Sequence, residues 1–160
     1  MSSLLATNID FPWRTENRIH HTEELRVTRN RVDVVFFEEK ENNEIGFVVA
    51  VEAKLKNWRQ AIQQAYRDRL FADRVYVALP DRFASGAIEN LSEFRRASIG
   101  LIVLTDEEAK IYHHPPINRQ RSSFHTLSVK TSLSAAIARD LEQGDQPKVR
   151  GGARSLVLSS

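Results

Sequence analysis

One stretch of the sequence decides the fold: residues 31–65 read RVDVVFFEEKENNEIGFVVAVEAKLKNWRQAIQQA. Two apolar runs, 31–37 and 46–53, flank a polar segment with two asparagines, which is typical of two strands joined by a hairpin. Both faces of each run are apolar, which predicts central strands covered on both sides. The spacing that follows predicts a helix from residue 57 to about residue 71.

Three ionisable side chains interrupt or end these apolar runs: Asp33, Glu52 and Lys54. An unpaired charge is costly to bury, so each needs a partner, a metal ion or a function. Residues two apart on a strand project to the same face, so Glu52 and Lys54 point the same way. Singly, each is explained by an ion pair at a strand end, with Arg31 or Arg29 beside Asp33. The three together favour an active site.

The register of the hairpin sets the distance between the two acids. If Glu39 pairs with Glu44, Asp33 lies opposite Ala50 and diagonal to Glu52, with Cα atoms about 7–8 Å apart. Two carboxylates at that separation can share a metal ion, because Mg²⁺ binds oxygen at about 2.0–2.1 Å. We therefore expect the two acids and the lysine to converge on one face.

The order of these features resembles the PD-(D/E)XK nuclease superfamily, the restriction-endonuclease-like fold. It comprises Asp33, a hairpin, Glu52-Ala53-Lys54, a helix that carries Gln64, and an apolar strand at 74–79. The resemblance runs from residue 31 to residue 80, roughly a third of the chain. The Glu-x-Lys triplet alone is common, whereas the ordered set is much more specific. Val32 stands where many members of the superfamily have proline.

The resemblance implies a role for each residue of the set. Asp33 and Glu52, with the backbone carbonyl of Ala53, would bind Mg²⁺, for which Mn²⁺ can substitute. Lys54 would orient or activate the attacking water and offset negative charge on the phosphorus. Gln64 would position the water or the phosphate; without the resemblance, a surface glutamine on the flank of the helix is an equally good interpretation.

The implied function is a divalent-metal-dependent phosphodiesterase that cleaves nucleic acid, and we favour a DNA endonuclease. RNA as substrate, and the specificity for sequence or structure, stay open. The alternative is a module on the same fold that binds nucleic acid or protein without cleaving it. A subunit that presents its second helix and its tail to a partner is compatible with either function. Cleavage of both strands would favour a homodimer, although the sequence shows no interface signature.

Basic residues flank the expected site and continue into the tail. Those near the helix are expected on its exposed sides, where charges are usually solvated but also suit phosphate contacts. The basic tail is expected to be either a phosphate-contacting arm or a disordered end. The candidate nucleic-acid contacts are Lys56, Arg59, Arg67, Lys148, Arg150 and Arg154.

The composition is that of a globular protein: of 160 residues, 41% are apolar and 28% are charged, with a formal net charge of +2. The absence of cysteine excludes disulfides and thiolate zinc sites. No apolar run approaches the roughly 20 residues of a membrane span, and no basic segment leads into a signal core. We expect a soluble, cytoplasmic protein that does not contact a membrane.

The rest of the chain predicts an α/β fold, a mixed central sheet flanked by helices on both faces. Further strands are expected at 24–28, 74–79, 100–104 and 109–112, and a second helix at 83–94. The predicted division is a nuclease-like core, residues 1–112, and an extension, residues 113–160, with a basic tail and one short helix capped by Ser132. Members of the superfamily usually begin with a helix that adds an acid. Here Glu16, Glu23 and Glu24 are the candidates, with solvated surface acids favoured.

Overall fold

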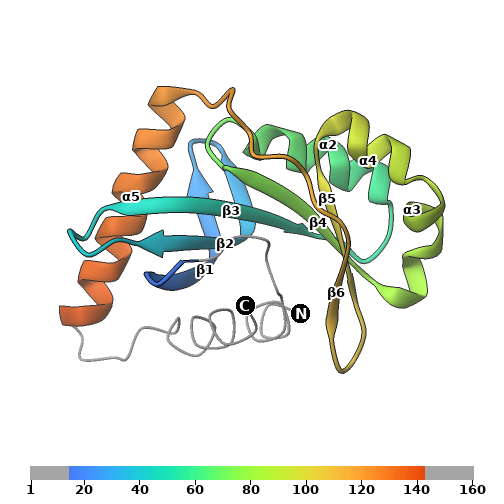
Figure 1. Cartoon of the computed structure of the whole chain (residues 1–160), viewed down its shortest axis with the longest axis horizontal. Helices are drawn as coiled ribbons and strands as arrows, with labels where there is room; N and C mark the ends of the chain where they lie inside the picture. Colours follow the sequence, from blue (N-terminus) through green and yellow to red (C-terminus); the bar gives the residue numbers. More distant parts are fainter. Residues whose placement is uncertain (1–14, 143–160) are drawn as a thin grey trace.

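The chain forms a six-stranded mixed sheet, and the computed structural model describes residues 15–142 (Figure 1). The strands follow one another across the sheet in the order of the sequence. The third, fourth and fifth strands are parallel to one another, and every other neighbouring pair is antiparallel. The strands are β1 (Arg18–Val27), β2 (Asn30–Glu39), β3 (Ile45–Ala53), β4 (Arg74–Pro80), β5 (Gly100–Leu104) and β6 (Ala109–His113). The predicted α/β class with a mixed sheet is confirmed.

Helices connect the parallel strands and follow the last strand. Helix α2 (Trp58–Asp68) joins β3 to β4. The 3₁₀ turn η1 (Asp81–Phe83), α3 (Ser85–Glu89) and α4 (Leu91–Ala97) join β4 to β5, so the single helix expected at 83–94 is broken at Asn90. After β6, the last helix of the described residues is α5 (Ser123–Glu142). No helix within residues 15–142 is long and apolar enough to cross a membrane.

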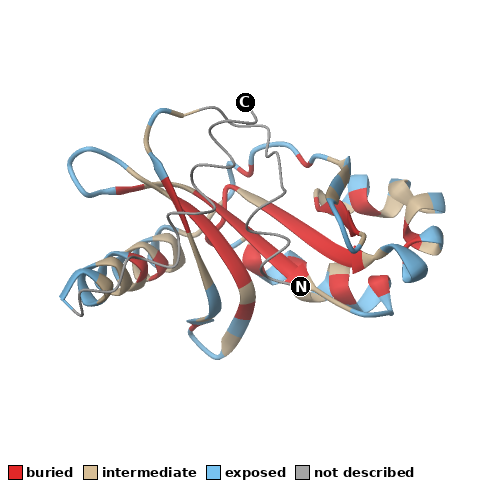
Figure 2. Ribbon diagram, turned by 90° about the horizontal axis from the view of Figure 1, so that it is seen from below, coloured by how far each residue is buried: buried red, intermediate tan, exposed pale blue. Residues whose placement is uncertain are grey.

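The core has two layers, one on each face of the sheet. Strands β2 and β3 are largely buried on both sides, as expected, and so are β4 and β5, whereas the edge strands β1 and β6 are partly exposed (Figure 2). The described helices α2, α3, α4 and α5 all contribute to one layer, through residues such as Ala61, Ala87, Phe94 and Leu133. The other layer is built from strand residues such as Phe36. The expectation of helices on both faces is therefore not met by the part of the chain that is described.

The hairpin between β2 and β3 has a different register from the one we expected. Glu39 pairs with Ile45, not with Glu44, and the register shifts by one between Phe37 and Glu39. The backbone N–H of Lys40 bonds to the carbonyl of Glu44, and Asn43 adopts a positive φ of 62°, which closes the turn. As a result Ala50 lies opposite Val35 rather than opposite Asp33.

Two elements are longer than the sequence pattern indicated. Strand β1 begins at Arg18, because it pairs along the whole of β2. Helix α5 begins at Ser123, and Ser132, expected as its cap, lies inside it with its hydroxyl bonded to the carbonyl of Ser128. Its Leu133 lies in the same core layer as the sheet, so this part of the predicted extension packs on the predicted core.

Candidate functional site

The two acids of the predicted site lie on neighbouring strands under the helices. Val34 lies opposite Val51, and continuing this register by one residue places Asp33 opposite Glu52. Both side chains project to the helix-covered face, because side chains alternate along a strand and the face carries Val35. Glu52 is only 7% exposed and Asp33 is half-buried. Residues directly opposite one another have Cα atoms about 4.5–5.5 Å apart, so the acids are closer than we predicted.

The side chains of Asp33 and Lys54 each contact a residue at the C-terminal end of β3. The Oδ2 atom of Asp33 accepts a hydrogen bond of 2.9 Å from the backbone N–H of Ala53. The Nζ atom of Lys54 lies 3.9 Å from Oε1 of Glu52, and its side chain is 32% exposed against 9% for Glu52. The cluster is therefore buried at the acids and reaches solvent at the lysine.

Helix α2 brings two further polar side chains to this face of the sheet. Asn57 caps the helix by accepting a hydrogen bond from the backbone N–H of Gln60, and small residues such as Ala61 and Ala65 let it pack closely on the strands. Gln64 and Asp68 are one turn apart, so they lie on the same side of the helix. The Oε1 atom of Gln64 and the Oδ2 atom of Asp68 are both buried without a hydrogen-bond partner.

Asp68 is the site residue that the sequence reasoning missed. From the apolar stripe through Trp58, Ala61 and Ala65, a step of four residues leads to Arg69, but the buried position is three residues on, at Asp68, which is 5% exposed. Arg69 instead caps the C-terminal end of the helix. A buried stripe advances by three or four residues, so the sequence contained this alternative.

Burial and mutual repulsion raise the pKa values of two of the acids. The pKa of Glu52 rises to about 7, first because it is buried and then because Asp33 is close, while the nearby cations Lys54, Arg67 and Arg31 act in the opposite direction. The pKa of Asp68 rises to about 8, through burial and then through the charges of Glu52 and Asp33. Glu52 and Asp68 therefore titrate near neutral pH, within one electrostatic cluster to which the charge of Asp33 contributes.

The three basic residues expected beside the site are exposed, as predicted. A guanidinium nitrogen of Arg67 donates to the Oδ1 atom of Asn30 at 3.2 Å. Arg59 lies 4.2 Å from the ring centroid of Trp58, and Lys56 is near the ring of Phe83. Their role as phosphate contacts stays a prediction, as does that of Lys148, Arg150 and Arg154, which lie outside the described residues.

The candidate N-terminal acids remain at the surface. Glu16, Glu23 and Glu24 are all exposed, and Glu24 pairs with Arg31 at 3.6 Å. None of them contributes to the raised pKa values of Glu52 and Asp68. The Arg31 guanidinium is thus directed to Glu24, and the ion pair between Arg31 and Asp33 that we considered does not form.

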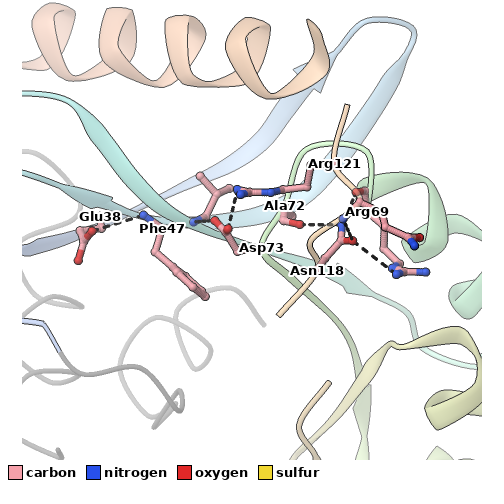
Figure 3. Close-up of polar contacts among 9 residues, drawn as sticks. Glu38, Phe47, Arg69, Ala72, Asp73, Asn118 and Arg121 are labelled. Atoms are coloured by element: carbon pink, nitrogen blue, oxygen red, sulfur yellow. Dashed lines mark hydrogen bonds and ion pairs between the residues drawn. The ribbon is translucent and has the colours of Figure 1, made fainter. Parts of the chain in front are cut away.

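A third buried acid, Asp73, has a purely structural set of partners next to the end of α2 (Figure 3). Its carboxylate accepts a hydrogen bond of 2.8 Å from the backbone N–H of Val48 and pairs with Arg121. Asn118 donates to the backbone carbonyls of Arg69 and Ala72. These contacts fix the loop from Arg69 to Asp73, which begins at the residue after Asp68.

The donor set of the site fits a hard divalent cation. Asp33, Glu52 and Asp68 supply carboxylate oxygens, the ligand type that Mg²⁺ prefers. One of these oxygens, Oδ2 of Asp68, is buried without a hydrogen-bond partner, as is the amide oxygen of Gln64. Among residues 15–142, no three His, Cys, Asp or Glu side chains are close enough together to ligate one ion directly. Mg²⁺ is commonly held by one or two carboxylates and keeps several of its waters, and Asp33 and Glu52 provide such a pair.

Comparison with known proteins adds little to the chemistry of the site. No family model and no curated protein matches the chain. A solved structure, described as a protein of unknown function from Silicibacter pomeroyi, is similar to 78% of this chain and 80% of its own, with 20% identity and a TM-score of 0.48.

Proposed function

We propose that this chain is a divalent-metal-dependent phosphodiesterase that cleaves nucleic acid, with DNA favoured as substrate and a cytoplasmic location. The observation that carries the proposal is the position of Asp33 opposite Glu52, on neighbouring strands and on the helix-covered face of the sheet. The Nζ atom of Lys54 lies 3.9 Å from Oε1 of Glu52, on the solvent side. Charges gathered on buried strands are costly without a function. In this reading the sheet is a variant of the restriction-endonuclease-like fold.

Each side chain of the cluster has a task in phosphodiester hydrolysis. Asp33 and Glu52, with the carbonyl of Ala53, would hold the cation, which when bound polarises the phosphate and makes a water more acidic. Lys54 is placed beside Glu52 and open to solvent, so its ammonium group can approach the phosphate and offset the charge that develops there. Gln64 offers a buried, unpartnered oxygen that can orient the attacking water.

The alternative function is a non-catalytic module that binds nucleic acid or protein. It is favoured by the contacts that Asp33 and Lys54 make within the chain, because these contacts give both residues a structural use. It does not account for the burial of Glu52, whose pKa of about 7 reflects a carboxyl that is poorly compensated by its surroundings. Metal dependence separates the two functions.

The test is a cleavage panel of plasmid and oligonucleotide DNA and RNA, with Mg²⁺, with Mn²⁺ and with EDTA. We expect cleavage with either ion and none with EDTA. Glu52→Gln and Lys54→Ala should abolish cleavage in folded protein, whereas Lys110→Ala, on the edge strand β6, should leave it unchanged. Wild-type rates from Lys54→Ala, or no cleavage of any substrate by the wild type, would refute the proposal.

A further inference from the structure

Asp68 is a buried acid that the chemistry above does not use. It is 5% exposed, and its Oδ2 atom has no hydrogen-bond partner. A buried carboxyl group without a partner costs free energy whether it is charged or protonated. A group of this kind in a well-packed layer therefore requires an explanation.

Two arginines lie next to Asp68 in the sequence, but neither forms an ion pair with its carboxyl group. Arg67, the adjacent residue, donates to Asn30, and Arg69 lies over the ring of Tyr66. The other buried aspartate of the same region, Asp73, has the backbone N–H of Val48 and Arg121 as partners. A buried aspartate in this region can therefore have partners, and the unpartnered oxygen is specific to Asp68.

The surroundings of Asp68 indicate what its partner is. Gln64, one helical turn earlier, has a second buried oxygen without a partner. Helix α2 packs on β3, on the face of the sheet that carries Glu52 and Asp33, and the charges of both acids act on Asp68. Gln64 and Asp68 lie on the same side of that helix, and their unpartnered oxygens are buried. The unpartnered oxygens of Gln64 and Asp68 need hydrogen-bond donors, and the neighbouring carboxylates of the site need a positive charge. A hydrated divalent cation provides both, because its waters are strong donors and Mg²⁺ gives them up reluctantly.

We propose that Asp68, together with Gln64, accepts hydrogen bonds from the water molecules of a divalent cation held by Asp33 and Glu52. Asp68 is then a positioning residue for the cation and not a direct ligand. The inference rests on the cation site of the proposed function, but not on cleavage of nucleic acid.

Mg²⁺ affinity, measured by titration calorimetry on the full chain without nucleic acid, tests this assignment. Loss of an outer partner of a metal site typically costs about 10–100-fold in affinity, so Asp68→Asn should raise the Kd for Mg²⁺ by about that factor. Gln64→Met, which removes the amide at similar volume, should also raise the Kd. Because this second change alters no charge, its effect cannot come from long-range electrostatics.

Asp73→Asn is the matched control, since it removes the same charge from the same region of the fold. It should keep the wild-type Kd for Mg²⁺ while its melting temperature falls, because the pair with Arg121 is lost. Wild-type affinity in Asp68→Asn, or a wild type that does not bind Mg²⁺, overturns the inference. A protein that cleaves no nucleic acid but loses Mg²⁺ affinity in both site variants would refute the proposed function and support this inference.

Discussion

The Oδ2 atom of Asp33 accepts a hydrogen bond of 2.9 Å from the backbone N–H of Ala53, which joins β2 to the last residue of β3. This contact brings an acid of one strand to the Glu52-Ala53-Lys54 segment of the next. It also decides which substitutions are informative. Asp33→Ala would leave the N–H of Ala53 without its partner, whereas the amide oxygen of Asp33→Asn can still accept that hydrogen bond.

The stability of Asp33→Asn separates a metal site from a structural pair. Relief of the repulsion between Asp33 and Glu52 should raise the melting temperature of the metal-free protein, and loss of a ligand should abolish stabilisation by Mg²⁺. In the wild type, Mg²⁺ at 100 times its Kd should stabilise the fold by about 2.7 kcal/mol, visible as a rise of several degrees.

Melting curves of both proteins, each with EDTA and with Mg²⁺, measure these effects. A destabilised Asp33→Asn beside a wild type that is indifferent to Mg²⁺ would instead support a structural role for the whole cluster.

The metal-free protein should lose stability as the pH rises through the raised pKa values of the site. Glu52 has a folded pKa of about 7 against 4.5, and Asp68 one of about 8 against 3.8. The folded state binds more protons than the unfolded state in these intervals, so the two groups favour folding below their ordinary pKa values and lose that contribution as pH rises. Urea unfolding in EDTA across this range should show a smaller decline in Glu52→Gln and in Asp68→Asn than in the wild type. Equal declines in all three proteins would contradict the raised pKa values.

The two strands of the hairpin could be predicted from the sequence, but their register could not. The apolar runs and the polar turn determine β2, β3 and the face on which Asp33 and Glu52 lie. A shift of two residues leaves every side chain on its own face, so the pattern does not distinguish Ala50 from Glu52 as the neighbour of Asp33. The irregularity between Phe37 and Glu39, which sets the true register, has no visible signal in the polar turn.

For the helices too, the sequence pattern allows more than one arrangement. The spacing that predicts α2 permits a continuation at either Asp68 or Arg69, and only packing on the sheet selects the acid. In α5, Phe124 and Leu127 are 71% and 68% exposed, so apolar residues near its start do not follow one buried stripe. A periodic pattern indicates a helix only when one face is consistently buried.

Helix α5 should be needed for the stability of the whole domain, although we predicted that it belongs to an extension. Leu133 is 0% exposed and packs in the layer shared with the sheet, whereas Leu127, in the same helix, is 68% exposed. Leu133→Ala should lower the free energy of unfolding by about 2–5 kcal/mol, and Leu127→Ala should change it by no more than about 0.5 kcal/mol. Urea unfolding of the two variants measures the difference, and similar values would show that α5 does not contribute to the core.

Binding of duplex DNA should depend steeply on salt. Lys56, Arg59 and Arg67 are exposed beside the site, and the tail adds three more cations. Each phosphate that a cation neutralises contributes about −0.9 to the slope of log affinity against log salt. Removal of residues 145–160 should make the slope shallower by about 0.9 for each tail cation that contacts a phosphate, and metal-dependent cleavage should persist. Lys56→Ala should also make the slope shallower, whereas Lys110→Ala, on β6, should not. A truncated chain with full affinity but no cleavage would show that the tail serves the site and not the phosphates.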